Sequence, residues 1–215
     1  MTDTATAFEA IYADAHLLVL NKPAGLLSVP GKGDGKKDCL SSRVQKSYPD
    51  ALIVHRLDMA TSGLMLMGRG AVMQTALSKL FETREILKRY EAFVDGHMAA
   101  NPNWQLIDLP IALDWPNRPL RIIHEDGKAS QTRWRAMRYN ADANTTRVEL
   151  EPITGRSHQL RVHLKALGHA VLGDALYAPA DVQAKSSRLL LHACTLRFLH
   201  PASGEAMVFE NASAF

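Results

Sequence analysis

One short segment combines residue types that could support nucleophilic or acid–base chemistry. An aspartate, Asp58, stands between Leu57 and the apolar run Leu64–Met67, at the edge of what should be a buried strand. A carboxylate so close to a core needs a cationic or hydrogen-bonding partner to stay ionised. From these residues alone two interpretations stay open: Asp58 caps a turn closed by Thr61 and Ser62, or it is a catalytic carboxylate.

A second segment supplies cationic side chains. Thr154 or Ser157 should cap a helix predicted over Ser157–Leu167, whose first turns present His158 and Arg161 on one face because they are three residues apart. Arginine is the side chain best suited to bind a buried carboxylate through two parallel hydrogen bonds. A solvated basic helix face would explain the same residues.

Other kinds of site find no support in the sequence. The stretch containing Lys32, Lys36 and Lys37 lacks the hydroxyl residue that follows the lysine of a P-loop, so we expect a surface loop whose lysines could contact phosphates. His158 and His163 would lie about 140° apart around a helix, too far to share one face. No HExxH or GxSxG pattern occurs. Neither a metal site nor a serine nucleophile is expected.

Composition indicates a globular protein with a mildly basic surface. The 215 residues are 47% hydrophobic and 22% charged, with a net charge of +3, which argues against disorder and permits a polyanionic partner without requiring one. Cys39 and Cys194 form no CxxC pair, so neither a disulfide framework nor a thiolate zinc site is expected, and two thiols suit the cytoplasm. The N-terminus lacks the pattern of a signal peptide, and no apolar run approaches the roughly 20 residues of a membrane span.

Strand-like patterns outnumber helical ones and follow one another along the chain. Apolar residues between Val72 and Phe81 recur every three to four positions, which predicts a helix over Ala71–Thr83. Adjacent strand patterns favour an α+β fold with a mixed, mainly antiparallel sheet. The other predicted helices are a short one capped by Asp38 and running to Ser47, and Ser157–Leu167 ending at Gly168. Predicted strands are Ile11–Leu20 (as one strand or a pair), Leu64–Met67, Lys88–Asp95, Trp104–Leu109, Gln131–Tyr139, Thr145–Glu151, Leu189–Leu199 and Met207–Phe209.

Five segments in a fixed order resemble the motifs of one enzyme family. The segment around Asp58 resembles the signature of the RluA family of pseudouridine synthases, and the segment around Arg161 resembles its second basic motif. The resemblance runs from about Ile11 to Phe209 and favours a functional role for Asp58 and Arg161 over the alternatives above. The segments are Asn21-Lys22-Pro23-x-Gly25-Leu26, His55-Arg56-Leu57-Asp58-x-x-Thr61-Ser62-Gly63-Leu64, Lys88-Arg89-Tyr90, Gly155-Arg156-x-His158-Gln159-Leu160-Arg161-x-His163, and Leu189-Leu190-Leu191-His192-Ala193 with His200-Pro201.

The resemblance implies an isomerase that needs no cofactor and no metal. Pseudouridine forms when the N1–C1′ bond of uridine breaks, the uracil turns, and C5 bonds to C1′. The catalytic residue would be Asp58, acting as a nucleophile or assisting removal of a sugar proton. Two further catalytic residues are implied: Arg161 would pair with Asp58, and Tyr90 would stack on the flipped uracil and help remove its C5 proton through the hydroxyl. The expected substrate-binding residues are Arg56, which would help displace the target base, Leu191 as an apolar wall, Arg118 as a phosphate contact, and Thr61 and His158.

The resemblance also implies an organisation and a set of partners. Helices should flank the sheet around a central active-site cleft, in a single catalytic domain over residues 11–215, after a flexible N-terminus of residues 1–10 and without an S4-type domain. The stretch Asp108–Pro119 resembles the family member that modifies both a 23S rRNA hairpin and tRNA anticodon stem-loops. We therefore expect both RNAs as partners of a cytoplasmic monomer without membrane association. The alternatives are a member acting on one RNA class, an N-glycosidase, and a non-catalytic RNA-binding module.

Overall fold

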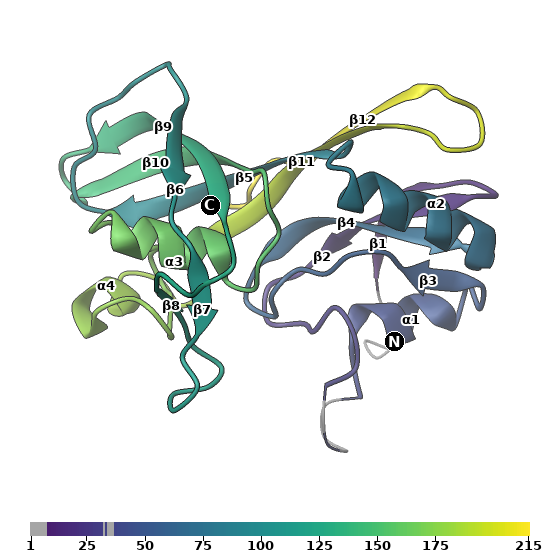
Figure 1. Cartoon of the computed structure of the whole chain (residues 1–215), viewed down its shortest axis with the longest axis horizontal. Coiled ribbons are helices and arrows are strands. Elements are labelled where there is room, and N and C mark those ends of the chain that lie inside the picture. Colours follow the sequence, from purple (N-terminus) through teal and green to yellow (C-terminus); the bar gives the residue numbers. More distant parts are fainter. Residues whose placement is uncertain (1–7, 32, 34–36) are drawn as a thin grey trace. The chain divides into compact units, whose positions relative to one another are not determined.

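The computed structural model describes residues 8–31, 33 and 37–215, and these pack into two compact units (Figure 1). Unit 1 contains the described part of Met1–Lys88 together with Ala193–Ala214. Unit 2 contains Arg89–His192 and the terminal Phe215. Lys32 and Lys36, two predicted phosphate contacts, lie outside the described residues.

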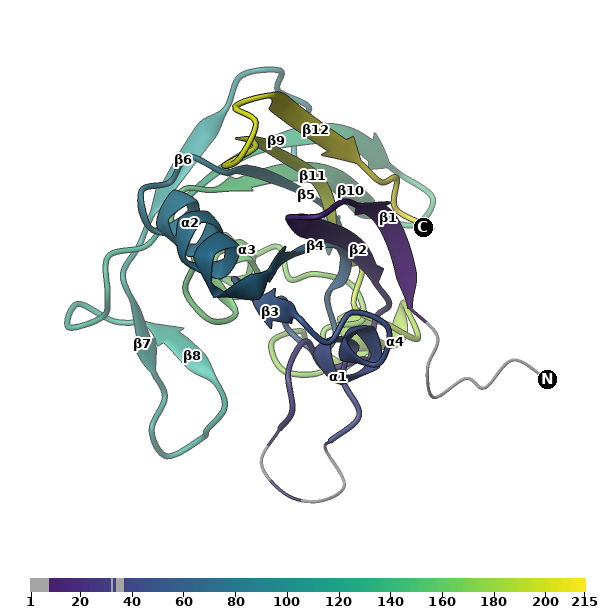
Figure 2. The same cartoon turned by 90° about the vertical axis from the view of Figure 1, so that its right-hand side faces the viewer.

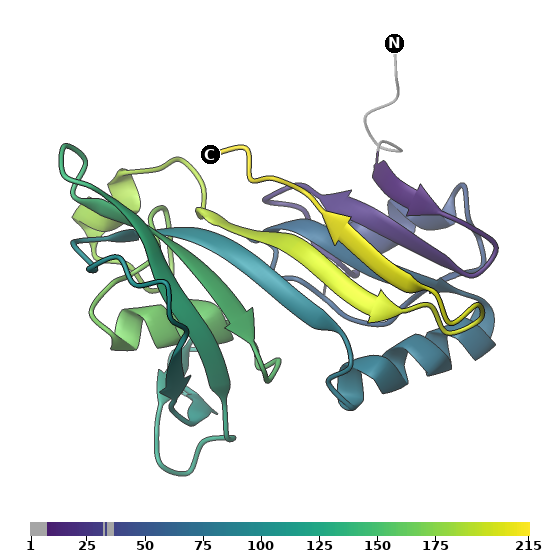
Figure 3. The ribbon, with the colours of Figure 1, turned by 90° about the horizontal axis from the view of Figure 1, so that it is seen from above.

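Unit 1 contains a mainly antiparallel set of strands and two helices. Its strands follow the order β1–β2–β4–β11, and β3 pairs with β4 while β12 pairs with β11. Figure 3 shows β11 and β12 in yellow as a long hairpin. The elements are β1 (Glu9–Ala13), β2 (Leu17–Lys22), α1 (Leu40–Gln45), β3 (Ala51–Ile53), β4 (Ser62–Arg69), α2 (Gly70–Glu82), β11 (Leu191–Leu199, whose first two residues belong to unit 2) and β12 (Ala206–Glu210).

The core of unit 1 forms where α2 packs on the sheet. Helix α2 buries Met73 and Leu77 in one cluster with Leu64 and Leu66 of β4. Every residue from Ser62 to Gly68 is buried, so β4 is covered on both faces and carries a continuous apolar run instead of an alternation. Each fully buried aliphatic side chain stabilises the fold by roughly 1.5–3 kcal/mol relative to an exposed one. The strand that follows Asp58 is thus firmly held.

Unit 2 combines four strands in antiparallel pairing with a separate two-stranded arm. Its strands follow the order β5–β10–β9–β6, and β7 pairs with β8 in a separate two-stranded sheet (Figure 2). The elements are β5 (Leu87–Asp95, whose first two residues belong to unit 1), β6 (Gln105–Asp108), β7 (Ile111–Leu113), β8 (Arg121–Ile123), β9 (Gln131–Asn140), β10 (Thr145–Pro152), α3 (Gln159–Ala166) and α4 (Ala180–Ala184).

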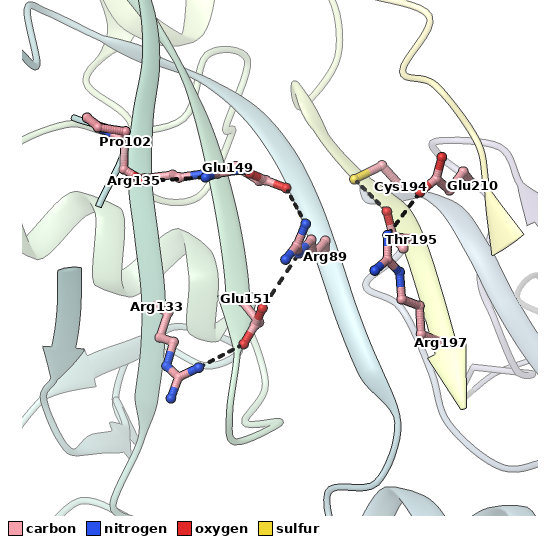
Figure 4. A network of polar contacts seen from close by, with 10 residues as sticks. All are labelled: Arg89, Pro102, Arg133, Arg135, Glu149, Glu151, Cys194, Thr195, Arg197 and Glu210. Atoms are coloured by element: carbon pink, nitrogen blue, oxygen red, sulfur yellow. Dashed lines mark hydrogen bonds and ion pairs between the residues drawn. The ribbon is translucent and has the colours of Figure 1, made fainter. Parts of the chain in front are cut away.

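The strand register of unit 2 gives its sheet two unlike faces. Leu150 stands opposite both Tyr90 and Trp134, so these three side chains share one face. Thr132 is two residues before Trp134 and bonds side chains of α3, so α3 covers this same face. The opposite face is an ionic ladder in which arginines and glutamates alternate (Figure 4). Its pairs include Arg89 with Glu149 and Glu151, Arg133 with Glu151, and Arg135 with Glu149.

Most predicted elements are confirmed, including the α+β class and the mainly antiparallel pairing. The predicted helix Ala71–Thr83 agrees with α2 to within one residue at each end. The first strand begins at Glu9, two residues earlier than predicted, and pairs with a second strand. In the described part of the chain no helix is long and apolar enough to cross a membrane.

Both predicted helix caps are wrong. Helix α1 is capped by the Cys39 side chain, which accepts from the Ser42 amide, while the Asp38 carboxylate binds Arg43 instead. Helix α3 begins after His158, whose left-handed backbone (φ 58°) makes no side-chain cap. The very short elements β3, β7, β8 and α4 had no counterpart among the predictions.

Candidate active site

The loop between β3 and β4 carries Asp58 in a half-buried position. Leu57 beside it is buried and Arg56 is exposed. The amide of Thr61 donates to the Asp58 carbonyl over 3.1 Å, which closes a turn directly before β4, and Thr61 itself is buried. The aspartate, Arg56 and Thr61, all predicted site residues, therefore lie on one short loop.

A fully buried lysine ties this loop to the preceding turn. The Lys22 ammonium group donates to the carbonyls of Pro23 (2.9 Å), Leu26 (2.8 Å) and Met59 (3.1 Å). Gly25 adds a backbone hydrogen bond to the same Met59 carbonyl over 2.8 Å. The residue that follows Asp58 is consequently fixed by two donors from the turn after β2.

Ser28 fixes the residue that precedes Asp58. Its buried hydroxyl donates to the Leu57 carbonyl over 2.8 Å and accepts from the Leu57 amide over 3.1 Å. One side chain thus satisfies both backbone groups of a buried loop residue, which would otherwise cost free energy. Asp58 is held from both sides through its backbone neighbours.

His55 anchors the start of the loop and is uncharged. Its Nε2 accepts from the Leu66 amide over 2.8 Å, and its ring stacks on Phe81 with centroids 4.3 Å apart. Burial, and to a lesser extent the neighbouring Lys88 ammonium group, lowers the pKa of His55 to about 3. Burial also lowers the pKa of Lys88. Because it is neutral at physiological pH, His55 serves to position the loop.

The turn into β4 requires glycine at position 63. Gly63 has φ +112°, and a Cβ placed there would lie 2.3 Å from the Ala193 carbonyl oxygen of β11. No other residue fits without moving the backbone of one strand. This explains the glycine near the start of β4.

In unit 2, Arg161 forms a buried ion pair with Asp174. Its Nη2 and Nε lie 2.6 Å and 2.8 Å from the two carboxylate oxygens, and the side chains are only 4% and 0% exposed. Asp174 also accepts from the amides of Leu176 and Tyr177. These bonds compensate for the cost of burying both charges and fix the plane of the guanidinium group.

Tyr177 joins Arg161 to His158 and to the β7–β8 arm. The guanidinium carbon of Arg161 lies 5.0 Å from the centre of the Tyr177 ring. The Tyr177 hydroxyl lies 2.6 Å from His158 Nδ1 and accepts from the Arg121 amide over 3.0 Å. Two predicted site residues, His158 and Arg161, therefore meet at one side chain.

Gln159 fixes α3 to the sheet and takes the place of the expected helix cap. Its Oε1 accepts from the Thr154 hydroxyl (2.7 Å) and the Arg156 amide (3.0 Å). Its Nε2 donates to the Gln131 carbonyl and the Thr132 hydroxyl, each over 2.9 Å. Both ends of the amide group are thus fully hydrogen-bonded. Thr154 therefore bonds a side chain of the helix and not its backbone.

The remaining predicted residues occupy different parts of unit 2. Tyr90 lies on the sheet face that α3 covers, and Leu191 is buried at the start of β11. Arg118 is exposed in the loop of the β7–β8 arm. The pairing of Arg161 with Asp58 and the stacking of Tyr90 and Leu191 on uracil stay predictions.

Sequence reasoning missed four residues that build the site: Lys22, Ser28, Asp174 and Tyr177. A lysine at the end of the apolar strand Leu17–Lys22 was a signal, because a buried ammonium group must be hydrogen-bonded. Asp174 gave no comparable signal, because it stands 13 residues beyond Arg161 in the sequence.

The described residues contain no group of three or more His, Cys, Asp or Glu side chains that could hold a metal ion. His163, one of the histidines considered for a metal site, uses both ring nitrogens in protein contacts. Its Nδ1 lies 2.9 Å from the Thr132 hydroxyl and its Nε2 lies 3.0 Å from the Leu109 carbonyl. Burial lowers the pKa of His163, so it is held as a neutral ring.

A carboxylate on a fixed loop, Asp58, and an arginine held by a buried ion pair in α3, Arg161, are compatible with an enzyme site, and comparison with known proteins defines the class. Residues 16–166 match the family model described as RNA pseudouridylate synthase. The chain therefore belongs to the RNA pseudouridylate synthase family, whose members are isomerases.

Individual relatives agree with this assignment. The chain is 49% identical over 206 residues to the dual-specificity RNA pseudouridine synthase RluA of Escherichia coli K12, covering 95% of this chain and 93% of the relative. It is 47% identical to the protein of that name from Yersinia pestis, covering 95% and 98%. The solved structure of human RNA pseudouridylate synthase domain containing 1 is similar with a TM-score of 0.80 at 25% identity, covering all of this chain and 87% of that one.

Proposed function

We propose that this protein converts uridine to pseudouridine in stem-loops of both 23S rRNA and tRNA anticodon arms, with Asp58 as the catalytic carboxylate. The observation that carries the proposal is the fixed loop. Lys22, Ser28 and His55 hold the backbone around Asp58 while its side chain stays half-buried. A carboxylate held in this way loses little freedom when it meets a substrate, which lowers the barrier to reaction.

The other residues take complementary roles in this proposal. Arg161 keeps Asp58 ionised and oriented, and Tyr90 and Leu191 hold the detached uracil so that its C5 can bond to C1′. Arg56 fills the space left by the flipped base, and Thr61, His158 and Arg118 contact the RNA. Flipping a uridine costs a few kcal/mol and costs less in a loop than in a duplex, so stem-loops are the favoured substrates.

The dual substrate is supported by the relatives at 47–49% identity, which are named dual-specificity RNA pseudouridine synthases. We place the protein in the cytoplasm as a monomer that needs no cofactor. The thiols of Cys39 and Cys194, which form no disulfide, are compatible with a reducing compartment.

Release of tritium from [5-3H]uridine tests the chemistry, because the C5 hydrogen leaves when C5 bonds to C1′. The purified protein should release tritium from a 23S rRNA hairpin and from a tRNA anticodon stem-loop without liberating free uracil. Asp58→Asn should slow release by more than about a thousandfold and leave RNA affinity within about threefold, because it removes the reacting group and keeps the shape. Asp181→Asn, the same change at an exposed position, is the matched control.

The other possible results of the tritium-release assay point to different functions. Release from one RNA alone would keep the chemistry and remove the dual substrate. Free uracil would indicate an N-glycosidase. No release from either RNA, with intact binding, would leave a non-catalytic RNA-binding module and overturn the proposal.

A further inference from the structure

The loop of the β7–β8 arm presents an exposed aromatic residue with an arginine beside it. Trp115 keeps 64% of its surface exposed, although tryptophan is on average among the more buried residues. The guanidinium carbon of Arg118, also exposed, lies 4.3 Å from the centre of the Trp115 ring. Arg118 therefore lies over one face of the Trp115 ring, and we call this exposed pair the Trp115–Arg118 platform.

The loop that carries the platform is ordered by its own hydrogen bonds. The Asp114 carboxylate accepts from the side-chain amide of Asn117 over 3.0 Å and 3.1 Å and from the Asn117 backbone amide over 3.4 Å. The Asp114 amide donates to the Leu120 carbonyl, and the Leu120 amide donates to the Asn117 carbonyl, each over 3.0 Å. A preformed loop loses little conformational entropy on binding, so a contact made there adds more to affinity.

The foot of the arm is attached to the Arg161 cluster. The Arg121 amide at the start of β8 donates to the Tyr177 hydroxyl, and the Tyr177 ring lies under Arg161. Ile111 and Val162 pack with Tyr177 in one buried cluster. Arg118 is three residues from Arg121, so the chain places it within about 10 Å of this attachment. The platform therefore extends directly from residues that we assign to substrate handling.

The charges and the exposed ring of the arm favour binding of an unpaired base over binding of a phosphate. Three cationic side chains between positions 108 and 130 face four carboxylates, which gives a net charge of −1 with histidine neutral. A backbone-binding surface would need an excess of cations. An exposed ring next to a guanidinium plane instead suits base stacking, which accepts any base. The cations are Arg118, Arg121 and Lys128, and the carboxylates are Asp108, Asp114, Glu125 and Asp126.

We propose that the Trp115–Arg118 platform stacks an unpaired base of the RNA loop that presents the target uridine. The proposal rests on the proposed function and deepens it. Because every base has a π-face, one platform can serve two RNAs of different sequence, as a dual-specificity enzyme requires.

Steady-state kinetics and direct RNA binding test the platform. Trp115→Ala should raise both KM and the RNA dissociation constant by about 5- to 100-fold, the range measured for loss of one base–aromatic stack, and leave kcat within about twofold. Trp115→Phe should recover part of the affinity. Arg118→Lys keeps the charge and loses the planar group, so it should also weaken binding. Leu106→Ala, at a 54% exposed position on β6, is the matched control.

Abasic nucleotides placed one by one in the loop identify the stacked base. At one position other than the target uridine, an abasic site should weaken binding by wild type as much as Trp115→Ala does, and should not weaken binding by the variant further. The platform would be overturned if abasic sites and Trp115→Ala gave additive losses of affinity at every position. It would also be overturned if Trp115→Ala left the dissociation constant unchanged or lowered kcat alone. RNA binding is measured without turnover, so it tests the platform independently of catalysis. The proposed function would fail in a different way, if the wild-type protein formed no pseudouridine.

Discussion

The Asp58 loop of unit 1 and the Arg161 helix of unit 2 fix their functional residues in different ways. In the loop the contacts act on the backbone, because Lys22 and Ser28 bind carbonyls on either side of Asp58. In the helix the contact acts on the side chain itself, since Asp174 holds the guanidinium group of Arg161 through two hydrogen bonds. The first arrangement positions the Asp58 carboxylate through its backbone, and the second fixes the orientation of the charged Arg161 guanidinium group.

The difference predicts unequal costs when each arrangement is broken. Removing one partner of a buried ion pair leaves the other charge uncompensated in the interior. Removing a donor to backbone carbonyls leaves neutral acceptors, which is less costly. Stability should therefore depend most on Asp174, and the geometry around the carboxylate should depend most on Lys22.

Asp174→Asn should have the largest effect on stability. It keeps the size of the side chain but leaves Arg161 without a buried counter-charge, so we expect a loss of about 3–5 kcal/mol in the free energy of unfolding, measured with urea. Glu210→Gln breaks the exposed pair of Glu210 with Arg197 and should change stability by less than about 1 kcal/mol. Equal effects of the two changes would contradict the assigned role of the buried pair.

Lys22→Met should have the next largest effect. It removes the shared donor of three carbonyls and keeps the apolar stem, so we expect a loss of about 2 kcal/mol in stability. Turnover should fall more than RNA affinity, because the residue after Asp58 loses an anchor. Lys79→Met, at an exposed position of α2, should alter neither. A Lys22→Met protein with wild-type kcat would show that the loop needs no such anchor.

The neutral state of His55 predicts a pH dependence of stability. Its pKa is about 3 in the folded protein and 6.5 in the unfolded chain, so below pH 6.5 the unfolded chain takes up a proton first. The stabilisation is complete above pH 6.5 and is lost as the pH falls toward 3, with a limiting slope of about 1.4 kcal/mol per pH unit. His55→Gln keeps an acceptor and cannot titrate, so urea unfolding across this range should give a flatter profile than wild type. Parallel profiles for wild type and His55→Gln would contradict a neutral His55 ring in the folded protein.

Tyr177→Phe should have the smallest effect. It removes the hydroxyl that His158 and Arg121 share and keeps the ring under Arg161, so we expect a loss of about 1 kcal/mol. Hydrogen exchange of the Arg121 amide should become faster. Unchanged protection of that amide would show that the arm is held by packing alone.

Local patterns in the sequence predicted the elements well. The 3.6-residue period identified α2, and Gly168, which has φ +85°, marked the end of α3. Strands of three residues such as β7 and β8 show no period and could not be found in this way. The caps failed because Asp38 and Thr154 had other partners available, and only the folded chain decides between them.

The sequence predicted which site residues lie together only where those residues belong to one short segment. His158 and Arg161 were expected on one helix face, and they meet at Tyr177 although His158 lies before the helix. The carboxylate that holds Arg161, Asp174, stands 13 residues further on, beyond a turn, and no local pattern connects them. Lys22 likewise acts on a carbonyl 37 residues away. Such contacts depend on the packing of whole elements.

A site-resolved map of pseudouridine in total RNA tests the central claim most directly. Cells lacking this protein would be compared with the same cells carrying either the wild-type gene or the Asp58→Asn variant. We predict the loss of sites in both a 23S rRNA hairpin and tRNA anticodon loops, restored by the wild type and not by Asp58→Asn. Restoration by Asp58→Asn, or a map unchanged when the protein is absent, would contradict the claim that the Asp58 carboxylate carries out this reaction.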